Sequence, residues 1–245
     1  MQYTKYELLP YNLHIINTKK FKTITIRINF KTKAMKEDLT KRNLLSDLLL
    51  RSTKNYPNER EMAIKCEDLY GLNYSSHCSI SGNYSLLSFI TSFLNERFTE
   101  KGMNKESIKF FLNMLINPNA ENNKFNSDVF KITKKNIYDI LISEKDNPGH
   151  YSMMELKKII DKDSPISYNS NGYLEDLDKI NESNLYEYYQ NLLKTNLIDV
   201  FVIGDVDNNQ IKEIFADTFK INTFKKTKER HIIEHKKLPT APFIA

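Results

Sequence analysis

The alternation of apolar and polar residues predicts strands at both ends of the chain. Residues 22–30 (KTITIRINF) place isoleucines on one face and polar side chains on the other, which is the period of two of a half-buried strand. We expect residues 11–17 to pair with this segment as a second strand. The run 198–203 (IDVFVI) is apolar with little alternation, which is typical of an internal strand.

A second pair of strands is predicted in the middle of the chain. Residues 72–80 alternate in polarity, and residues 84–93 form another apolar-rich run. The dipeptide Gly82-Asn83 between them favours a tight turn. We therefore expect an antiparallel hairpin.

Helical spacing of apolar residues predicts most of the remaining elements. Leucines recur at this spacing in residues 38–51, which indicates a helix with one buried face. Further helices are expected from Asn58 to Gly71 and over residues 104–116, 126–144, 149–161, 182–194 and 208–218, with Asn58, Asn104 and Asn126 as N-caps and Asp205-Val206-Asp207 as a capping turn. This order of elements predicts an α+β fold with a mainly antiparallel sheet packed by helices.

Composition supports a folded domain in a reducing compartment. The chain has 245 residues, of which 40% are hydrophobic and 11% aromatic, enough to bury a core. Its two cysteines do not make a disulfide framework, and no apolar run reaches the length of a membrane span. The N-terminus lacks the pattern of a secretory signal. We expect a cytoplasmic location and no membrane partner.

The net charge of +5 lies in one segment near the C-terminus. Residues 220–237 contain seven basic and two acidic residues, so residues 1–219 are neutral overall. We interpret the basic segment as an exposed linker, because a nucleic-acid channel usually spreads its arginines and lysines over a folded face. Nucleic-acid association through this segment is the alternative.

Several strings resemble peptidase family M16, which includes insulinase, pitrilysin and the mitochondrial processing peptidase. They are RSTKNYP (51–57), LYGLNYSS (69–76), KDNP (145–148) and LYEYYQNLLKTNLIDVFVIGDVD (185–207). In order and spacing they resemble one half of such a peptidase over residues 8–219. The resemblance implies a LuxS/MPP-like metallohydrolase-type domain, with domain boundaries at 1–219 and at 220–245 for a basic linker leading into a truncated or missing second domain.

The resemblance also implies that the zinc site is missing. Active members carry His-x-x-Glu-His on the leucine-rich helix, which supplies two zinc ligands and the general base. Asn43, Ser46 and Asp47 occupy these positions, and the third ligand falls near Asp139 or Ile140. We therefore expect no catalytic, cofactor-binding or metal-binding residues and no cofactor.

A literal HxxEH does occur at His231–His235, inside the basic segment. The segment is also compatible with a short strand, in which the two imidazoles would lie about 13 Å apart, too far to share one zinc ion. We interpret this match as coincidence. The remaining histidines, His14, His77 and His150, are isolated, and we expect them to be packed or solvated rather than catalytic. In a strand, His77 and Cys78 point to opposite faces and cannot act together.

These observations favour a non-catalytic M16 homologue over an enzyme. The family implies a structural or regulatory subunit that forms a peptide-binding chamber with a zinc-bearing partner, or with a second M16-like half, and grips peptide through edge-strand pairing. The closest likeness is to the motif-lacking member of a bacterial pair whose name is associated with modification of elongation factor P. The alternative within the enzyme class is a divergent zinc metallopeptidase using Asp47, Asp139 and His231 or His235.

Overall fold

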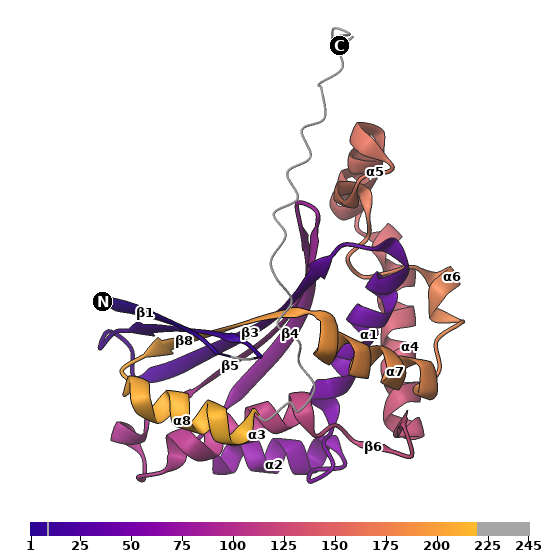
Figure 1. The fold of residues 1–245 in the computed structure, drawn as a ribbon. Coiled ribbons are helices and arrows are strands. Elements are labelled where there is room, and N and C mark those ends of the chain that lie inside the picture. The colour runs from indigo at the N-terminus through magenta and orange to yellow at the C-terminus, as the bar shows by residue number, and fades with distance from the viewer. Residues whose placement is uncertain (9, 220–245) are drawn as a thin grey trace, which may run out of the picture.

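The computed structural model describes residues 1–8 and 10–219, which form a six-stranded sheet with helices packed against one face (Figure 1). The sheet order is β1 (Gln2–Glu7), β2 (Asn12–Asn17), β8 (Leu197–Gly204), β3 (Thr23–Lys33), β5 (Tyr84–Leu94) and β4 (Asn73–Ser81). The helices are α1 (Lys36–Arg51), α2 (Glu59–Asp68), α3 (Met103–Ile116), α4 (Ser127–Ser143), α5 (Pro148–Asp161), α6 (Leu174–Leu177), α7 (Glu182–Thr195) and α8 (Asn208–Thr218). A small hairpin, β6 (Ala120–Glu121) and β7 (Lys124–Phe125), lies outside the main sheet.

Strand pairing confirms the hairpin of β4 and β5 and corrects the expected pairing of the first two predicted strands. β2 and β3 are not neighbours, because β8 lies between them, parallel to β2 and antiparallel to β3. β8 is the apolar run that the sequence marks as internal, and a central position buries it between two strands. β2 pairs on its other side with β1, an edge strand of largely exposed residues that the hydrophobic pattern does not reveal.

Helix boundaries agree with most of the predicted caps. The side chains of Asn58, Asn126 and Asp207 accept hydrogen bonds from the first turns of α2, α4 and α8. The prediction for Asn104 is wrong. The N-cap of α3 is Gly102 at φ +100°, and the Asn104 side chain accepts from the Glu96 amide instead. The sequence pattern also misses α6 and the β6–β7 hairpin.

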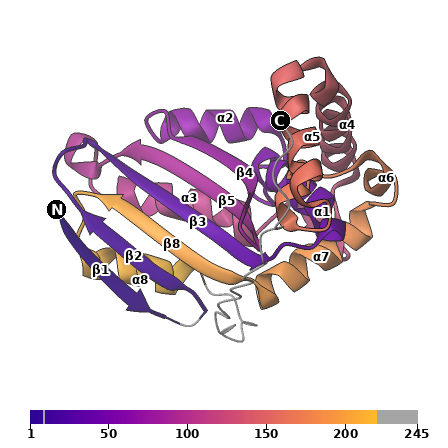
Figure 2. The same cartoon turned by 90° about the horizontal axis from the view of Figure 1, so that it is seen from above.

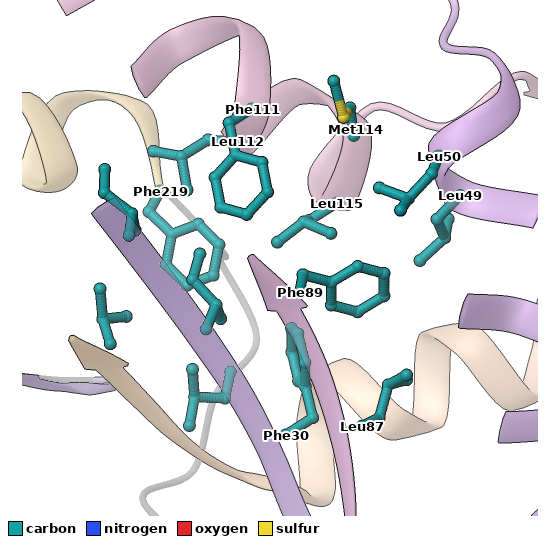
Figure 3. Close-up of a cluster of buried hydrophobic side chains, with 14 of the residues drawn as sticks. Phe30, Leu49, Leu50, Leu87, Phe89, Phe111, Leu112, Met114, Leu115 and Phe219 are labelled. Atoms are coloured by element: carbon teal, nitrogen blue, oxygen red, sulfur yellow. The ribbon is translucent and has the colours of Figure 1, made fainter. Parts of the chain in front are cut away.

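The core lies between the sheet and the helices (Figure 3). The strand residues that face the helices, such as Ile26 on β3 and Phe89 on β5, are fully buried. They meet leucines of α1 and aromatic residues of α3, among them Phe111. A fully buried side chain of this size contributes about 1.5–3 kcal/mol relative to an exposed one, so these contacts fix the helices to one side of the sheet.

The opposite face of the sheet carries His14, Phe201, Arg27 and Ile90, and we call it the open face. No described helix crosses it (Figure 2). These four side chains are half-buried, whereas the alternate residues of the same strands are buried. Within the described residues, the fold therefore places its helices on one side of the sheet. None of the described helices is both long and apolar enough to span a membrane, and the cytoplasmic location stays a prediction.

Candidate functional site

Helix α1 carries the three positions at which the resemblance implies a zinc motif. Its leucines are buried against the core, as the periodicity predicts. Asn43 and Asp47 are half-buried on the same side of the helix, and Ser46 is only 4% exposed. The chemistry available at the site therefore depends on what these three side chains contact.

Asn43 is bound to the loop of residues 169–173, which we call the latch loop. The Asn43 Nδ2 donates to the carbonyl oxygen of Asn171 at 3.0 Å. One turn earlier, Thr40 Oγ1 accepts from the Tyr173 amide at 2.9 Å. Gly172 lies directly on Thr40, because a Cβ built there would be 2.5 Å from Thr40 Oγ1 and 2.6 Å from its Cα. Asn43, at the position of the first zinc ligand, therefore binds the latch loop through its side-chain amide.

The end of α4 fixes the other side of the latch loop. Glu144, in the short 3₁₀ helix Glu144–Asp146, accepts hydrogen bonds from the side-chain amides of Asn169 and Asn171, each at 2.7 Å. Hydrogen bonds to a carboxylate are about twice as strong as those between neutral groups. The latch loop is consequently held between α1 and the C-terminal end of α4.

Ser46, at the position of the general base, is bonded within the protein. Its hydroxyl donates to the Asn43 carbonyl at 2.7 Å, and its own carbonyl accepts from Ser76 Oγ of β4 at 2.9 Å. Cys78 of β4 lies near the same hydroxyl, and burial raises the pKa of its thiol to about 11. A buried hydroxyl without a neighbouring base cannot take the proton of a metal-bound water.

The two candidate acids are held by cations of their own helices. Asp47 accepts from Arg51 Nε at 3.0 Å and from its Nη2 at 2.8 Å. Arg51 also contacts Glu59. On α4, Asp139 pairs with Lys135 at 3.3 Å and is exposed. The structure therefore gives each carboxylate a separate cation.

Zinc does not fit this set of residues. Catalytic zinc takes three protein ligands, mostly imidazoles, whereas Asn43 offers an amide that already donates to a carbonyl, and Asp47 is occupied by Arg51. Among the described residues, no group of three or more histidines, cysteines, aspartates or glutamates lies close enough to hold a metal ion. The HxxEH at His231–His235 lies outside the described residues.

Two of the remaining histidines lie on the open face of the sheet. His14 contacts Tyr3 Oη at 2.8 Å and Asp199 Oδ1 at 3.3 Å. His77 contacts Arg27 Nη2 at 3.5 Å, and burial together with the charge of Arg27 lowers its pKa. Neither is isolated in the fold, although both are isolated in the sequence. His150 is exposed in the first turn of α5, as expected of a solvated residue.

Arg42 is a residue of structural importance that the hydrophobic pattern does not reveal. It precedes Asn43 in α1, and it is fully buried. Its guanidinium donates to the Phe30 carbonyl at 2.7 Å and to Asn196 Oδ1 at 2.8 Å, joining α1 to β3 and to the start of β8. In the sequence, Arg42 is only a charged residue beside the leucine stripe of α1. The solvent-exposed face of an ordinary helix shows the same pattern, so the sequence does not mark Arg42 as buried.

Comparison with known proteins places this geometry in context. No family model matches the chain. It is 28% identical over 209 residues to Probable inactive metalloprotease YmfF of Bacillus subtilis (strain 168), a match that covers 84% of this chain and 49% of the relative. A conserved protein from Enterococcus faecalis V583 superposes with a TM-score of 0.88 at 25% identity, over 94% of this chain and 54% of that protein.

A peptidase M16 inactive domain from Pseudomonas fluorescens has the same fold, with a TM-score of 0.73 at 15% identity over 94% of this chain and 53% of that domain. The chain thus spans about half the length of the proteins that it matches. The predicted fold class is confirmed. The chain has the α+β fold of an M16 peptidase domain, and it is similar in sequence to a protein named as an inactive metalloprotease.

Proposed function

We propose that this chain is a non-catalytic M16-type half that forms a peptide-binding chamber with a zinc-bearing M16 partner. The observation that carries the proposal is which residues stand at the motif positions of α1 and how they are bonded. Asn43, Ser46 and Asp47 stand where the motif would be, and each is bonded inside the protein. The likeness to a relative named as inactive supports the same conclusion.

Strand β4 is the element on which we expect peptide to bind. It is an edge strand of the six-stranded sheet, paired only with β5 among the described strands. Its side chains alternate between exposed and half-buried over residues 73–78, and Ser76 ties it to α1 beside the motif position. An extended peptide could add to this edge through backbone hydrogen bonds.

We propose a partner because the fold is that of one M16 domain, and the resemblance to the family implies a second M16-like half. A two-half chamber needs a second M16-like half, and catalysis would need that half to carry an intact HxxEH. The boundary at residues 219 and 220, the cytoplasmic location and the likeness to the protein associated with elongation factor P stay predictions.

The test is co-expression of the chain with an M16-type polypeptide of the same genome that retains HxxEH. We expect the two to co-purify, zinc to follow the partner, and cleavage of peptides to need the partner. Stoichiometric zinc in the chain alone, with peptide cleavage that Asp47→Asn abolishes, would favour the divergent metallopeptidase instead. Binding that falls steeply with salt and is lost when residues 220–237 are removed would favour nucleic-acid association.

A further inference from the structure

The latch loop carries the one Asn-Gly dipeptide of the chain, Asn171-Gly172. Asparagine loses its amide most readily before glycine, because glycine has no side chain to keep its backbone nitrogen away from the asparagine side chain. The Gly172 nitrogen attacks Cγ of Asn171 and the Cγ–Nδ2 bond breaks. The proton of the attacking nitrogen passes through solvent to Nδ2, which leaves as ammonia. Water then opens the cyclic imide and leaves aspartate or isoaspartate at position 171.

The closed latch binds both groups that must meet in this reaction. The Gly172 amide donates to the Asn169 carbonyl at 3.0 Å, and Asn171 Nδ2 donates to Glu144 Oε1 at 2.7 Å. The backbone of Asn171 is fixed as well, since its amide donates to Asn169 Oδ1 at 2.9 Å and its carbonyl accepts from Asn43 Nδ2 at 3.0 Å. The attack must break some of these bonds first. A loop held in this way is protected, and local opening is what releases the reacting groups.

The product of deamidation does not fit the closed latch. Its carboxylate would lie where the amide of Asn171 now donates to Glu144 at 2.7 Å. Two ionised carboxylates have no hydrogen to share, and their charges repel. Among the described residues, no cation forms an ion pair with Glu144 that would offset the added charge. In isoaspartate the main chain runs through the side-chain carbons, so the carbonyl that Asn43 binds is no longer part of a peptide bond.

We infer that the latch loop is a one-way switch, in which deamidation of Asn171 traps the loop away from Glu144 and α1. The closed loop is protected, the opened loop is exposed to the reaction, and the deamidated loop does not close as before. The switch acts at the candidate site, because opening removes the partner that Asn43 has in the loop. The inference goes beyond the proposed function and does not depend on it, since the chain alone would show the same behaviour.

The first experiment compares deamidation in the folded and the unfolded protein. Wild type is incubated in buffer and in guanidinium, and the tryptic peptide of residues 163–179 is sequenced by tandem mass spectrometry. We expect Asn171 to react at least about tenfold more slowly in the folded protein, because the loop must open first. Asn169, which precedes Ser170, is the control in the same peptide and should react more slowly than Asn171 in guanidinium. In folded Glu144→Ala, deamidation of Asn171 should be at least about fivefold faster than in folded wild type.

The second experiment places the product in the loop and measures cleavage by chymotrypsin after Tyr168 and Tyr173. Asn171→Asp should be cleaved at least about fivefold faster than wild type, because the loop loses a bond to Glu144 and gains a repulsion. Adding Glu144→Gln to this variant should return cleavage to within about twofold of wild type, because the glutamine amide can donate to the new carboxylate. The matched control is Asn55→Asp, the same change at an exposed residue, which should be cleaved like wild type. Circular dichroism checks that each variant is folded.

Three results would overturn the inference. They are equal rates of deamidation in the folded and unfolded protein, cleavage of Asn171→Asp within about twofold of wild type, and a double variant that is cleaved as fast as Asn171→Asp. The comparison of rates uses wild type, so it decides the question even where the aspartate variant does not fold. None of these results bears on the proposed function, which the co-expression experiment tests separately.

Discussion

The contact between Gly172 and Thr40 offers a direct test of how the latch loop is held on α1. Gly172→Ala adds a Cβ at a residue with φ +96°, where the left-handed backbone costs an L-residue about 1–2 kcal/mol. The new atom would lie 2.5 Å from Thr40 Oγ1 and 2.6 Å from Thr40 Cα, and overpacking of this kind costs about 1–3 kcal/mol. We therefore expect the free energy of unfolding to fall by about 2–5 kcal/mol.

The variant could relieve this strain by detaching the latch loop from α1, but detachment would itself cost free energy. It would break the bonds of Asn43 and Thr40 to the loop, each worth about 0.5–1.5 kcal/mol, and the two bonds to Glu144, each worth about 1.5–3 kcal/mol. Together these come to about 4–9 kcal/mol, against about 2–5 kcal/mol of strain. The loop of the variant should therefore shift only far enough to relieve the clash with Thr40 and should stay attached to α1, with unchanged proteolytic cleavage at residues 169–173.

Gly82→Ala provides the matched control. Gly82 also has a positive φ, +56°, but a Cβ there meets nothing within 4 Å, so only the backbone strain of about 1–2 kcal/mol applies. Guanidinium unfolding followed by far-UV circular dichroism gives both values. If the two variants lose the same stability within about 0.5 kcal/mol, the close approach of the latch loop to α1 is not as we describe.

Three further predictions address the side chains at and around the motif position. Arg42→Met should lower the free energy of unfolding by about 2–4 kcal/mol, because buried acceptors lose a charged donor, and a denaturation midpoint equal to that of wild type would contradict this. Cys78 is half-buried, and its thiol, with its pKa raised to about 11, should react with iodoacetamide at pH 8 much more slowly in the folded than in the unfolded protein. Its contribution to stability should decline as the pH rises above about 9, because the unfolded thiol ionises first. Labelling of Cys78 at equal rates in the two states would contradict the raised pKa. The triple variant Asn43→His, Ser46→Glu and Asp47→His should still not retain stoichiometric zinc, since it lacks the third ligand and must bury a glutamate, and plasma mass spectrometry after dialysis checks this.

The sequence by itself determined the elements that a local pattern encodes. The leucine stripe of α1, the hairpin at Gly82 and the asparagine caps of α2 and α4 follow from spacing and side-chain chemistry within a few residues. The absence of HxxEH from α1 is likewise a property of the sequence. These features depend on neighbours along the chain, so they can be predicted without the fold.

Only the tertiary structure decided which strands pair and which groups the side chains of α1 contact. The insertion of β8 between β2 and β3 joins segments about 180 residues apart, which no local pattern records. The bond from Asn43 to Asn171 and the burial of Arg42 are also long-range. Arg27 looks like an ordinary polar residue of an alternating strand until the register places it between Phe201 and Ile90. Side-chain type is fixed by the sequence, but the partner of each side chain is set by packing between distant segments.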